Sequence, residues 1–580
     1  MENFEIARIL GEVADLLEIQ GANSFRVRAY RNASRAVAQL TRPLAEMVEG
    51  NEDLTELPDI GETVAANIVE LLETGTLQRL EELGREIPIS LVELTRLEGI
   101  GPKKAARLWK ELDVTDLEQL EAAVKAGRVE TLPGFGPKSA AKILAAIDER
   151  RKQRGRMLLS EAEAFLTPLL RHMEKAPGLD RLEVAGSYRR RRETIGDLDL
   201  LVTVKGEGAR VVDHFASYPA VERITGQGDT KGSVVLRSGP AVDLRVVPPE
   251  SLGSALLYFT GSKEHNVELR TQAVRDGLKV SEWGIFRVTE EGEEGERIAG
   301  RTEEECYRVL GLPWIPPELR ENRGEIEAAR KGALPDLVTV KHLRGEVHAH
   351  TDWSDGALSV RELAEACLAR GLQYLVVTDH TPAVGVAGGL TAKRVRAQWD
   401  AIERAREKVE GIRIFRGLEV DILKDGSLDM EDEVLDELDF VIVAVHTYMA
   451  LDKSEMTERV VRALRHPAVD LLAHPTGRLL NRREPYGIDM ETVLHAAAEQ
   501  DVAVEINSSP RRLDLSDVHL ARARELGVPV AITTDAHKAK DLDNARYGVD
   551  QARRAWLERD DVLNARTATQ FAKWLRRRHG

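Results

Sequence analysis

Cysteine is scarce in this chain: its 580 residues include only Cys306 and Cys367. Two cysteines cannot build the disulfide framework that staples small secreted proteins. The chain also lacks an apolar run long enough for a membrane-spanning helix, and its N-terminus, MENFEIARIL, carries acidic residues early instead of a signal-peptide pattern. These absences exclude the disulfide-rich secreted class and the membrane-spanning class, and they predict a cytoplasmic enzyme of bacterial type.

An overall basic charge is missing too. The formal net charge is −16, which excludes a protein that is basic over its whole surface, as a nucleic-acid coat would be. DNA binding is still possible, because a local basic stripe is sufficient for it. With 42% hydrophobic and 31% charged residues over this length, we expect a globular chain of several domains.

The N-terminal third contains a short unit that recurs three times, beginning at Leu57, Leu97 and Leu132. Each copy is a tight, glycine-containing turn followed by an alanine-rich amphipathic helix, the pattern of a helix-hairpin-helix motif. Glycine lets backbone N–H groups approach a phosphate, and a helix N-terminus favours that anion. The alternative is a turn used for packing alone, and three copies favour binding of the DNA backbone. The expected contacts are Gly61, Gly99, Gly101, Lys103, Gly134, Gly136 and Lys138.

The first copy departs from the other two. It has Asp59 where the later copies have a leading glycine, so its phosphate contact is less secure. Upstream of it, the stretch FRVRAYRNASRAV from Phe25 predicts a basic helix face. Such a face is usually only a solvated surface, but this one also resembles the first helices of the small lyase-type domain of DNA polymerase beta.

The central stretch, AGSYRRRRETIGDLDLL from Ala185, carries two aspartates one residue apart. On a strand, alternate side chains share a face, so Asp197 and Asp199 should point the same way. A third aspartate, Asp243, lies in the similar strand AVDLRVV. Three carboxylates on adjacent strands can hold Mg²⁺ or Mn²⁺ and support an in-line phosphoryl displacement. The alternative is an exposed acidic strand end after a solvated arginine run.

This stretch, together with LYFTGS from Leu257 and the following Asn266 and Arg270, resembles the nucleotidyltransferase palm of the family X DNA polymerases. The resemblance implies that Asp197, Asp199 and Asp243 bind catalytic Mg²⁺ or Mn²⁺ and that Asp243 accepts the proton of the primer hydroxyl. It also implies nucleotide-binding roles for Gly186, Ser187, Arg190, Tyr258, Phe259, Gly261, Asn266 and Arg270, the last on the template side. Gly186, Ser187 and Arg190 would contact the triphosphate.

One position changes the expected chemistry. In the polymerase beta relatives of that family, a lysine on the helix after the first hairpin forms a Schiff base and removes deoxyribose phosphate. The matching residue here is Asn67 in TVAANIVELL, and an amide cannot form that Schiff base. We therefore expect no lyase activity by that route.

From about residue 339, short apolar strands alternate with amphipathic helices, which predicts a βα barrel. Histidines and acids follow the strands in order, at the end where such barrels place their sites. A lone histidine is usually a surface or satisfied core residue, but coincidence explains this ordered placement poorly. Imidazole and carboxylate together suit Zn²⁺, Mn²⁺ or Fe²⁺.

The C-terminal pattern resembles the polymerase-and-histidinol-phosphatase (PHP) domain, a metal-dependent phosphoesterase. The resemblance implies a Mn²⁺, Zn²⁺ or Fe²⁺ cluster with a bridging water as nucleophile. The implied ligands are His348, His350, Asp355, His380, Glu419, His446, His474, Asp535 and His537. Asp379 is expected to support the ligands, and Arg478 is a weaker candidate for facing a phosphate.

Together these resemblances cover the chain and imply a multidomain fold: an α-helical front, an α+β palm and thumb, and a distorted β/α barrel. The expected domains are a lyase-type helical domain over 1–85, tandem hairpins over 86–155, the palm over 156–249, the thumb over 250–317, a linker over 318–338 and the PHP domain over 339–580. The expected protein is a monomeric, nucleoid-associated repair polymerase that fills short gaps, as in base excision repair.

Its expected partners are gapped or primer-template DNA and deoxynucleoside triphosphates, with no membrane. We expect a 3′→5′ exonuclease in the barrel, with cleavage at abasic sites or processing of 3′ ends as further activities. One alternative is a PHP-type phosphatase or nuclease whose front end only tethers DNA, and another is a non-catalytic scaffold that bridges DNA ends. The complete aspartate triad and LYFTGS count against the first, and two complete metal sites count against the second.

Overall fold

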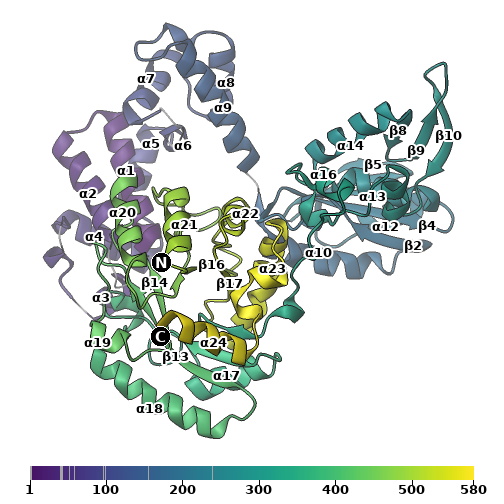
Figure 1. Ribbon diagram of the computed structural model, residues 1–580. Coiled ribbons are helices and arrows are strands. Elements are labelled where there is room, and N and C mark those ends of the chain that lie inside the picture. The colour runs from purple at the N-terminus through teal and green to yellow at the C-terminus, as the bar shows by residue number, and fades with distance from the viewer. Residues whose placement is uncertain are drawn as a thin grey trace. The chain divides into compact units, whose positions relative to one another are not determined.

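The computed structural model describes residues 3–39, 44–50, 52–57, 59–95, 97, 100–153, 156–237 and 239–579. The chain divides into two compact units, whose helices and strands are labelled in Figure 1. The first comprises 1–154 with the short segments 382–389 and 446–451, and the second comprises 155–381, 390–445 and 452–580. Among the described residues, no helix is long and apolar enough to cross a membrane.

The N-terminal part of the first unit is helical. Its helices share one apolar core, to which Leu10, Leu17, Ile68, Leu108 and Ile147 contribute fully buried side chains. The helices are α1 (Asn3–Gln20), α2 (Ser24–Gln39), α3 (Leu44–Glu49), α4 (Glu62–Thr74), α5 (Gln78–Glu86), α6 (Leu91–Thr95), α7 (Pro102–Leu112), α8 (Leu117–Lys125) and α9 (Pro137–Gln153).

The palm is a five-stranded sheet of order β2-β4-β7-β6-β5, in which β4 and β7 are parallel and the other pairs antiparallel. Its strands are β2 (Leu179–Val184), β4 (Asp197–Val204), β5 (Val221–Gln227), β6 (Lys231–Leu236) and β7 (Ala241–Val246). Helices α10 (Leu159–Met173) and α12 (Gly208–Ala216) bury one face, where Leu166 and Phe215 meet Leu200. On the other face, Leu201 packs with residues of α13 (Leu252–Thr260). Short elements complete the palm: β1 (Met157–Leu158), α11 (Gly186–Arg189) and β3 (Thr194–Ile195).

The thumb combines helices with an antiparallel sheet of order β10-β9-β8 around a small apolar core. The acidic run at 290–296 forms the turn of the antiparallel hairpin of β9 and β10 and the first residues of β10. The remaining thumb elements are α14 (Lys263–Arg275), β8 (Leu278–Ser281), β9 (Gly284–Val288), β10 (Glu294–Ala299) and α15 (Glu303–Val309).

The segment 318–338, predicted as a linker, contains regular structure and buried side chains. This segment contains α16 (Glu325–Arg330), and its Leu319, Ile326 and Leu337 belong to the thumb core. Arg320 is fully buried because its guanidinium pairs with Glu303, Nη1 to Oε1 at 2.6 Å.

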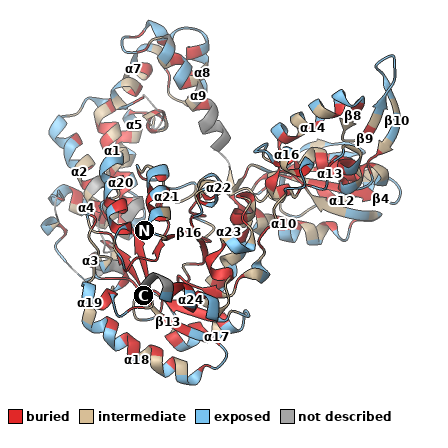
Figure 2. Ribbon diagram, viewed as in Figure 1, coloured by how far each residue is buried: buried red, intermediate tan, exposed pale blue. Residues whose placement is uncertain are grey.

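The C-terminal part of the second unit is a parallel seven-stranded barrel of order β11 to β17. Its strands are buried except at Arg413 and Arg416, which explains their largely continuous apolar sequences (Figure 2). The strands are β11 (Gly345–Glu346), β12 (Tyr374–Val377), β13 (Arg413–Asp421), β14 (Phe440–Ala444), β15 (Leu471–Leu472), β16 (Ala503–Asn507) and β17 (Val530–Thr533). Its helices are α17 (Val360–Leu368), α18 (Ala392–Lys408), α19 (Asp432–Leu435), α20 (Lys453–Leu464), α21 (Met490–Glu499), α22 (Asp517–Glu525), α23 (Ala545–Arg554) and α24 (Ala568–His579).

The barrel is nearly closed between its first and last strands. A single parallel bridge joins Ala349 to Ala536, and the side chain of Asn564 links the two strands by donating to Gly345 O at 2.9 Å and Ile532 O at 2.6 Å. At the end where the strands begin, Phe571 and Trp574 of α24 pack with residues from every strand or its first following residues. That end is filled with apolar side chains, which leaves the opposite end for polar chemistry.

Candidate active sites

The acidic site of the palm lies at the start of two parallel neighbouring strands. Asp199 of β4 is paired in register with Asp243 of β7, and Asp197 lies two residues before Asp199 on the same face. Asp197 is exposed, and the other two are partly buried. Asp243 accepts a hydrogen bond from Ser233 Oγ at 2.6 Å, which orients its carboxylate. The structure therefore brings together the three carboxylates that the sequence pattern singled out.

Electrostatic repulsion in this site is strong. Burial, followed by the charges of Asp197 and Asp243, raises the pKa of Asp199 to about 7. Three carboxylates held this close are a suitable donor set for hard divalent cations, which prefer oxygen ligands and relieve the repulsion.

Position 186 requires glycine because of its backbone conformation and its close neighbour Asp199. Its φ of +66° lies in the left-handed region, and a Cβ at this position would be 2.3 Å from Asp199 Oδ2. Only glycine lets the backbone that follows β2 pass so close to the acidic site.

A cavity of about 410 Å³ opens beside these carboxylates, within the size range typical of small-ligand pockets. It is lined by all eight residues predicted to bind nucleotide: Gly186, Ser187, Arg190, Tyr258, Phe259, Gly261, Asn266 and Arg270. Asp197 and Asp199 line it too, so separate stretches of sequence meet at one place. Asn266 donates from Nδ2 to Tyr258 O at 2.7 Å, and the rings of Tyr258 and Phe259 meet edge to face with centroids 5.1 Å apart.

Two further basic residues in this cavity were missed in the sequence. Arg156 and Lys263 line it, and Arg156 also donates to Thr194 Oγ1 at 2.9 Å. Burial lowers the pKa of Arg156, and the neighbouring charge of Arg192 lowers it further. Arg156 stands at the beginning of the palm, 30 residues before Gly186 in the sequence, and no local motif marks it.

The hairpin glycines have the geometry expected of backbone contacts. Gly61 and Gly101 are the N-caps of α4 and α7, with φ of −90° at both, and Gly136 directly precedes α9. A Cβ at any of these three positions would meet nothing within 4 Å. Neither backbone conformation nor packing requires glycine there, and the open space is compatible with the close approach of an outside group.

The leading turn position has a different geometry. Gly134 has φ +89°, and Asp59, at the equivalent place in the first copy, has φ +62°. The departure therefore keeps the left-handed turn, which aspartate tolerates better than most residues. Gly99, the third equivalent, lies outside the described residues. Lys103 and Lys138 are exposed on the helices that follow.

The predicted metal ligands of the C-terminal region gather at the end of the barrel where the strands finish. His348 and His350 follow β11, His380 follows β12, Glu419 is on β13, and His474 follows β15. Asp535 and His537 follow β17, and Asp355 lies in the loop after β11. His446 stands two residues beyond β14, the strand paired with the one that carries Glu419.

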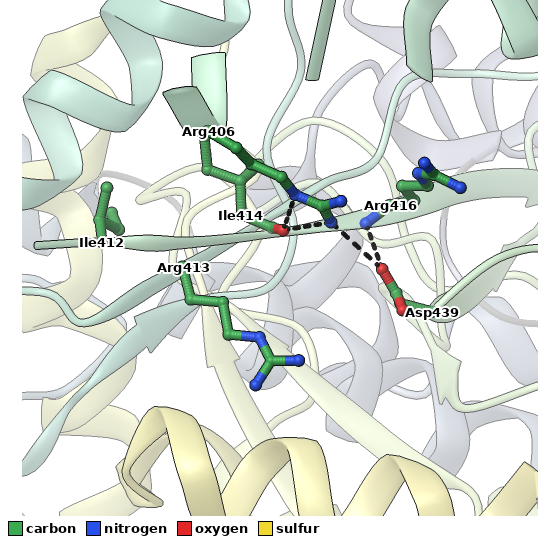
Figure 3. Close-up of a pocket in the computed structure, with 6 residues that line it drawn as sticks. All are labelled: Arg406, Ile412, Arg413, Ile414, Arg416 and Asp439. Atoms are coloured by element: carbon green, nitrogen blue, oxygen red, sulfur yellow. Dashed lines mark hydrogen bonds and ion pairs between the residues drawn. The ribbon is translucent and has the colours of Figure 1, made fainter. Parts of the chain in front are cut away.

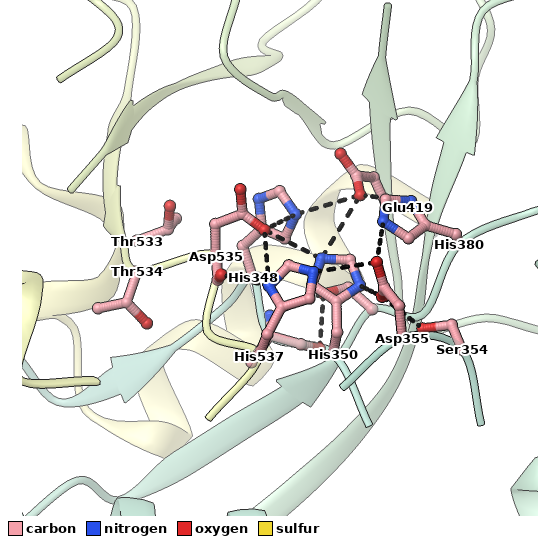
Figure 4. Close-up of polar contacts among 12 residues, drawn as sticks. His348, His350, Ser354, Asp355, His380, Glu419, Thr533, Thr534, Asp535 and His537 are labelled. Atoms are coloured by element: carbon pink, nitrogen blue, oxygen red, sulfur yellow. Dashed lines mark hydrogen bonds and ion pairs between the residues drawn. The ribbon is translucent and has the colours of Figure 1, made fainter. Parts of the chain in front are cut away.

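Figure 4 shows how closely these side chains approach one another. Glu419 is central: its Oε2 lies 2.9 Å from His380 Nδ1 and 3.4 Å from His348 Nε2, and its Oε1 lies 3.1 Å from His474 Nε2. Asp535 Oδ1 is 3.1 Å from His350 Nε2. Asp355 Oδ2 is 3.2 Å from His537 Nε2 and 3.7 Å from His380 Nε2.

These groups fit metal ions on two counts. Ligand atoms of His350, Asp355, His380 and His537 lie within 4.8 Å of one another, as do those of the set His348, His350 and Asp535. Among the described residues, the buried His348 Nε2 and His350 Nδ1 have no hydrogen-bond partner. A buried ring nitrogen without a hydrogen-bond partner is well suited to bind a cation.

The pKa values vary widely within this cluster. Burial, reinforced by His380, lowers the pKa of His350 to about 4. For His348, burial alone would lower the pKa, but Glu505, Glu419 and Asp535 together raise it well above its usual range. A neutral His350 can donate an electron pair to a cation without first losing a proton.

Glu505 contacts two of the predicted ligands, and it was not among the residues predicted from the sequence. It is fully buried on β16, and its Oε1 lies 2.6 Å from His348 Nδ1, which turns the other ring nitrogen towards the cluster. Its Oε2 accepts from His474 N at 2.6 Å. The sequence did contain a signal for Glu505, because a charged residue inside the apolar strand AVEIN must be buried, and a buried carboxylate needs a partner.

Asp379, expected to support the metal ligands, and Arg478, expected to face a phosphate, both contact other protein groups. Asp379 accepts from Thr351 N at 2.8 Å and Gln398 Nε2 at 2.5 Å, and from Ser354 Oγ, so it fastens the loop that carries Asp355. Arg478 pairs with the palm residue Glu193, Nη2 to Oε1 at 2.6 Å, instead of facing an open site.

A separate cavity of about 530 Å³ lies at the opposite end of β13, where Arg406, Arg413 and Arg416 gather beside Asp439 (Figure 3). Arg406 donates to Ile414 O at 2.9 Å, and Arg416 pairs with Glu403 at 2.6 Å. Arg413 and Glu419 lie six positions apart on this strand, a separation of roughly 20 Å. None of the predicted site residues lines this cavity, and most of its charge is already paired.

Family models match four parts of the chain. A helix-hairpin-helix domain matches 1–77, and a SAM-like helix-hairpin-helix tandem matches 91–149. The DNA polymerase beta thumb matches 255–321, and the PHP domain matches 346–509.

Curated relatives cover the chain as a whole and in parts. The "DNA polymerase/3'-5' exonuclease PolX" of Bacillus subtilis is 39% identical over 579 residues, 100% of both chains. DNA polymerase lambda of Rattus norvegicus is 26% identical over 55% of this chain and 56% of its own. A "Probable phosphatase" of Thermoanaerobacter is 32% identical over 38% of this chain and 89% of its own. The full-length match, with the thumb, hairpin and PHP models, shows that this chain belongs to the bacterial family X DNA polymerases that carry a C-terminal PHP domain.

Proposed function

We propose that the acidic site of the palm adds nucleotides to a primer in short DNA gaps and that the histidine site of the barrel removes them from 3′ ends. The polymerase and 3′→5′ exonuclease named for the full-length relative support both halves. The observation that carries the proposal is the meeting of all eight predicted nucleotide-binding residues in one cavity beside Asp197 and Asp199.

In the palm, each group has a distinct task. Arg190 and the backbone around Gly186 and Ser187 hold the triphosphate, and Tyr258 and Phe259 bound the sugar. Asp243 accepts the proton of the primer 3′ hydroxyl, for which its orientation by Ser233 prepares it. The aspartates hold Mg²⁺ or Mn²⁺, and the histidine cluster holds Mn²⁺, Zn²⁺ or Fe²⁺. Bound cations would supply Lewis-acid activation and charge neutralisation at both sites.

In the barrel, mixed imidazole and carboxylate donors favour ions softer than Mg²⁺. Glu419 bridges His348, His380 and His474, so one carboxylate can hold the cluster together. His446 completes the set of ligands in the proposal. The scissile phosphodiester would lie over this cluster, with the buried ring nitrogens fixed beneath it.

The hairpins are proposed to hold DNA by its backbone through Gly61, Gly99, Gly101, Gly134 and Gly136, with Lys103 and Lys138 adding charge. The substrates are then gapped or primer-template DNA and deoxynucleoside triphosphates. The enzyme would act as a monomer on DNA of the bacterial nucleoid.

A second activity of the barrel is favoured by its phosphatase relative, which matches 38% of this chain. The same cluster would then remove terminal phosphates or abasic residues that block 3′ ends. Such processing would prepare a primer for the palm.

The test uses a gapped DNA with a 5′-labelled primer, incubated with Mn²⁺ in the presence or absence of deoxynucleotides. Wild type should lengthen the primer with nucleotides and shorten it without them. Asp243→Ala should abolish lengthening and spare shortening, and His350→Ala should do the reverse. Loss of both activities from either single change, in a folded protein, would overturn the two-site proposal.

A further inference from the structure

Arg554 of the barrel lies against the residue that is proposed to bind triphosphate in the palm. Its Nη1 donates to Arg190 O at 2.8 Å and to Glu321 Oε1 at 3.0 Å. The same Glu321 Oε1 lies 3.1 Å from Arg190 Nε. Arg554 therefore fixes Arg190 twice, through its main-chain carbonyl and through the carboxylate that orients its guanidinium.

The network is buried and continuous. The side chain of Arg554 is 1% exposed, and its Nη2 lies 2.7 Å from Asp517 Oδ2 at the start of α22. Glu321 is 11% exposed and Arg190 14% exposed. Burial opposes ionisation of Glu321, but Arg554 and Arg190 outweigh it and lower its pKa. Buried charged groups with this many partners hold one geometry, because breaking any pair leaves a charge without compensation.

The conformation of the Arg190 side chain depends on these contacts with Arg554 and Glu321. Arg190 lines the nucleotide cavity and donates to Thr260 O, directly before Gly261. A guanidinium that must meet a triphosphate needs its angle set in advance, since a positioning error of about 1 Å can cost roughly a hundredfold in rate.

From these contacts we infer that Arg554 is a positioning residue for nucleotide binding, so that the PHP barrel serves the polymerase site independently of its own chemistry. The inference rests on the proposed role of Arg190. Lysine cannot replace Arg554, because one ammonium cannot reach Arg190 O, Glu321 and Asp517 in a planar fork.

The test is a double-mutant cycle in the full-length protein, with steady-state incorporation of one nucleotide into a one-nucleotide gap. Arg554→Lys should raise the KM for the deoxynucleotide on the order of tenfold, with a smaller change in kcat, as expected for coupled neighbours. In the Arg190→Ala background the same change should add nothing. Nuclease activity should match wild type, and the unfolding temperature should fall, because the change disturbs a buried ion-pair network.

The matched control is Arg553→Lys, the preceding residue on α23, which instead contacts Glu318 Oε1 at 2.8 Å and Val338 O at 3.2 Å. It should leave the KM unchanged. If Arg554→Lys does not fold, Glu321→Gln tests the same link from the thumb and should raise the KM in the same way.

The outcomes distinguish the proposed role of Arg190 in binding triphosphate from the inferred role of Arg554 in positioning it. An unchanged KM in Arg190→Ala would overturn the proposed role of Arg190. A raised KM in Arg190→Ala together with an unchanged KM in Arg554→Lys, or with additive effects in the double variant, would overturn the inference alone.

Discussion

At the scale of single residues, Gly186 is the most constrained position of the polymerase site. Gly186→Ala should lower the rate of nucleotide addition at least a hundredfold, because the new methyl group would lie 2.3 Å from Asp199 Oδ2. The nuclease should be unaffected. Primer extension and primer degradation, measured on the same preparation, check this result.

Gly277→Ala is the matched control. Gly277 also has a positive φ, +68°, but a Cβ there would meet nothing within 4 Å. Both variants carry similar backbone strain of about 1–2 kcal/mol, so equal losses of extension would mean that strain, and not the clash with Asp199, is responsible.

Glu505 makes a testable contribution to metal binding. Glu505→Gln removes the negative charge that holds His348 Nδ1 and should lower Mn²⁺ affinity about 10- to 100-fold. Nuclease activity titrated with Mn²⁺ should shift to higher concentration and recover at saturation, while extension stays normal. The exposed Glu499→Gln is the control, and an unshifted titration for Glu505→Gln would contradict its role.

Asn67 predicts that lyase activity through a lysine at this position is absent. Its Nδ2 donates to Tyr30 OH at 2.6 Å, and an amide cannot condense with an aldehyde. Borohydride should trap no covalent adduct between this enzyme and DNA with a 5′ deoxyribose phosphate. A trapped adduct would show that another amine provides this chemistry.

At the scale of elements, the hairpin turns should bind DNA without contributing to stability. The double variant Gly101→Ala and Gly136→Ala should leave the unfolding temperature unchanged, because both positions have open space and no positive φ. The Kd for gapped DNA should rise on the order of tenfold, since hydrogen bonds to charged groups contribute about 1.5–3 kcal/mol each. Fluorescence anisotropy at fixed salt measures the Kd, and unchanged binding would reassign these turns to packing.

Strands and helices were predictable where burial leaves a mark in the sequence. The stretch ending DLDLL and the strand AVDLRVV correspond to β4 and β7, and the apolar runs after residue 339 correspond to barrel strands. The site residues were found because they stand in dense local motifs at strand ends.

The remaining residues were not predictable because their partners are distant in the sequence. Arg554 and Glu321 are ordinary charged residues on a helix and in a loop until the barrel and the palm meet. The segment 318–338 resembles a linker because its buried charges, Arg320 and Glu325, are paired with Glu303 and His265 of the thumb. Periodicity carries no information about such pairs.

At the scale of the whole molecule, the joint between palm and barrel should respond to pH. Burial raises the pKa of Asp550 to about 6, although Arg191 Nε lies 3.6 Å from it. The folded protein thus holds this proton more tightly than the unfolded chain. The contribution of Asp550 to the free energy of unfolding is largest below pH 4 and falls by up to about 3 kcal/mol as the pH rises to about 6.

Asp550→Asn should remove that decline. Unfolding between pH 4 and 7 can be followed by tryptophan fluorescence, because every tryptophan except Trp109 lies in the second unit. The difference between variant and wild type should grow in favour of the variant as the pH rises. The exposed Asp560→Asn is the control, and parallel pH profiles for Asp550→Asn and wild type would contradict the assignment.

The apolar core of the palm includes two residues of the barrel, Leu513 and Tyr547, and Tyr547 OH donates to Glu163 at 2.7 Å. Truncating the protein before the barrel would therefore expose apolar side chains of the palm that the barrel buries, and the shortened polymerase would tend to aggregate. A nuclease-free enzyme for biotechnology is better obtained by a point change at His350 than by truncation. The same reasoning explains how a shared interior can keep two opposing activities in one polypeptide: neither half could be lost without damaging the other.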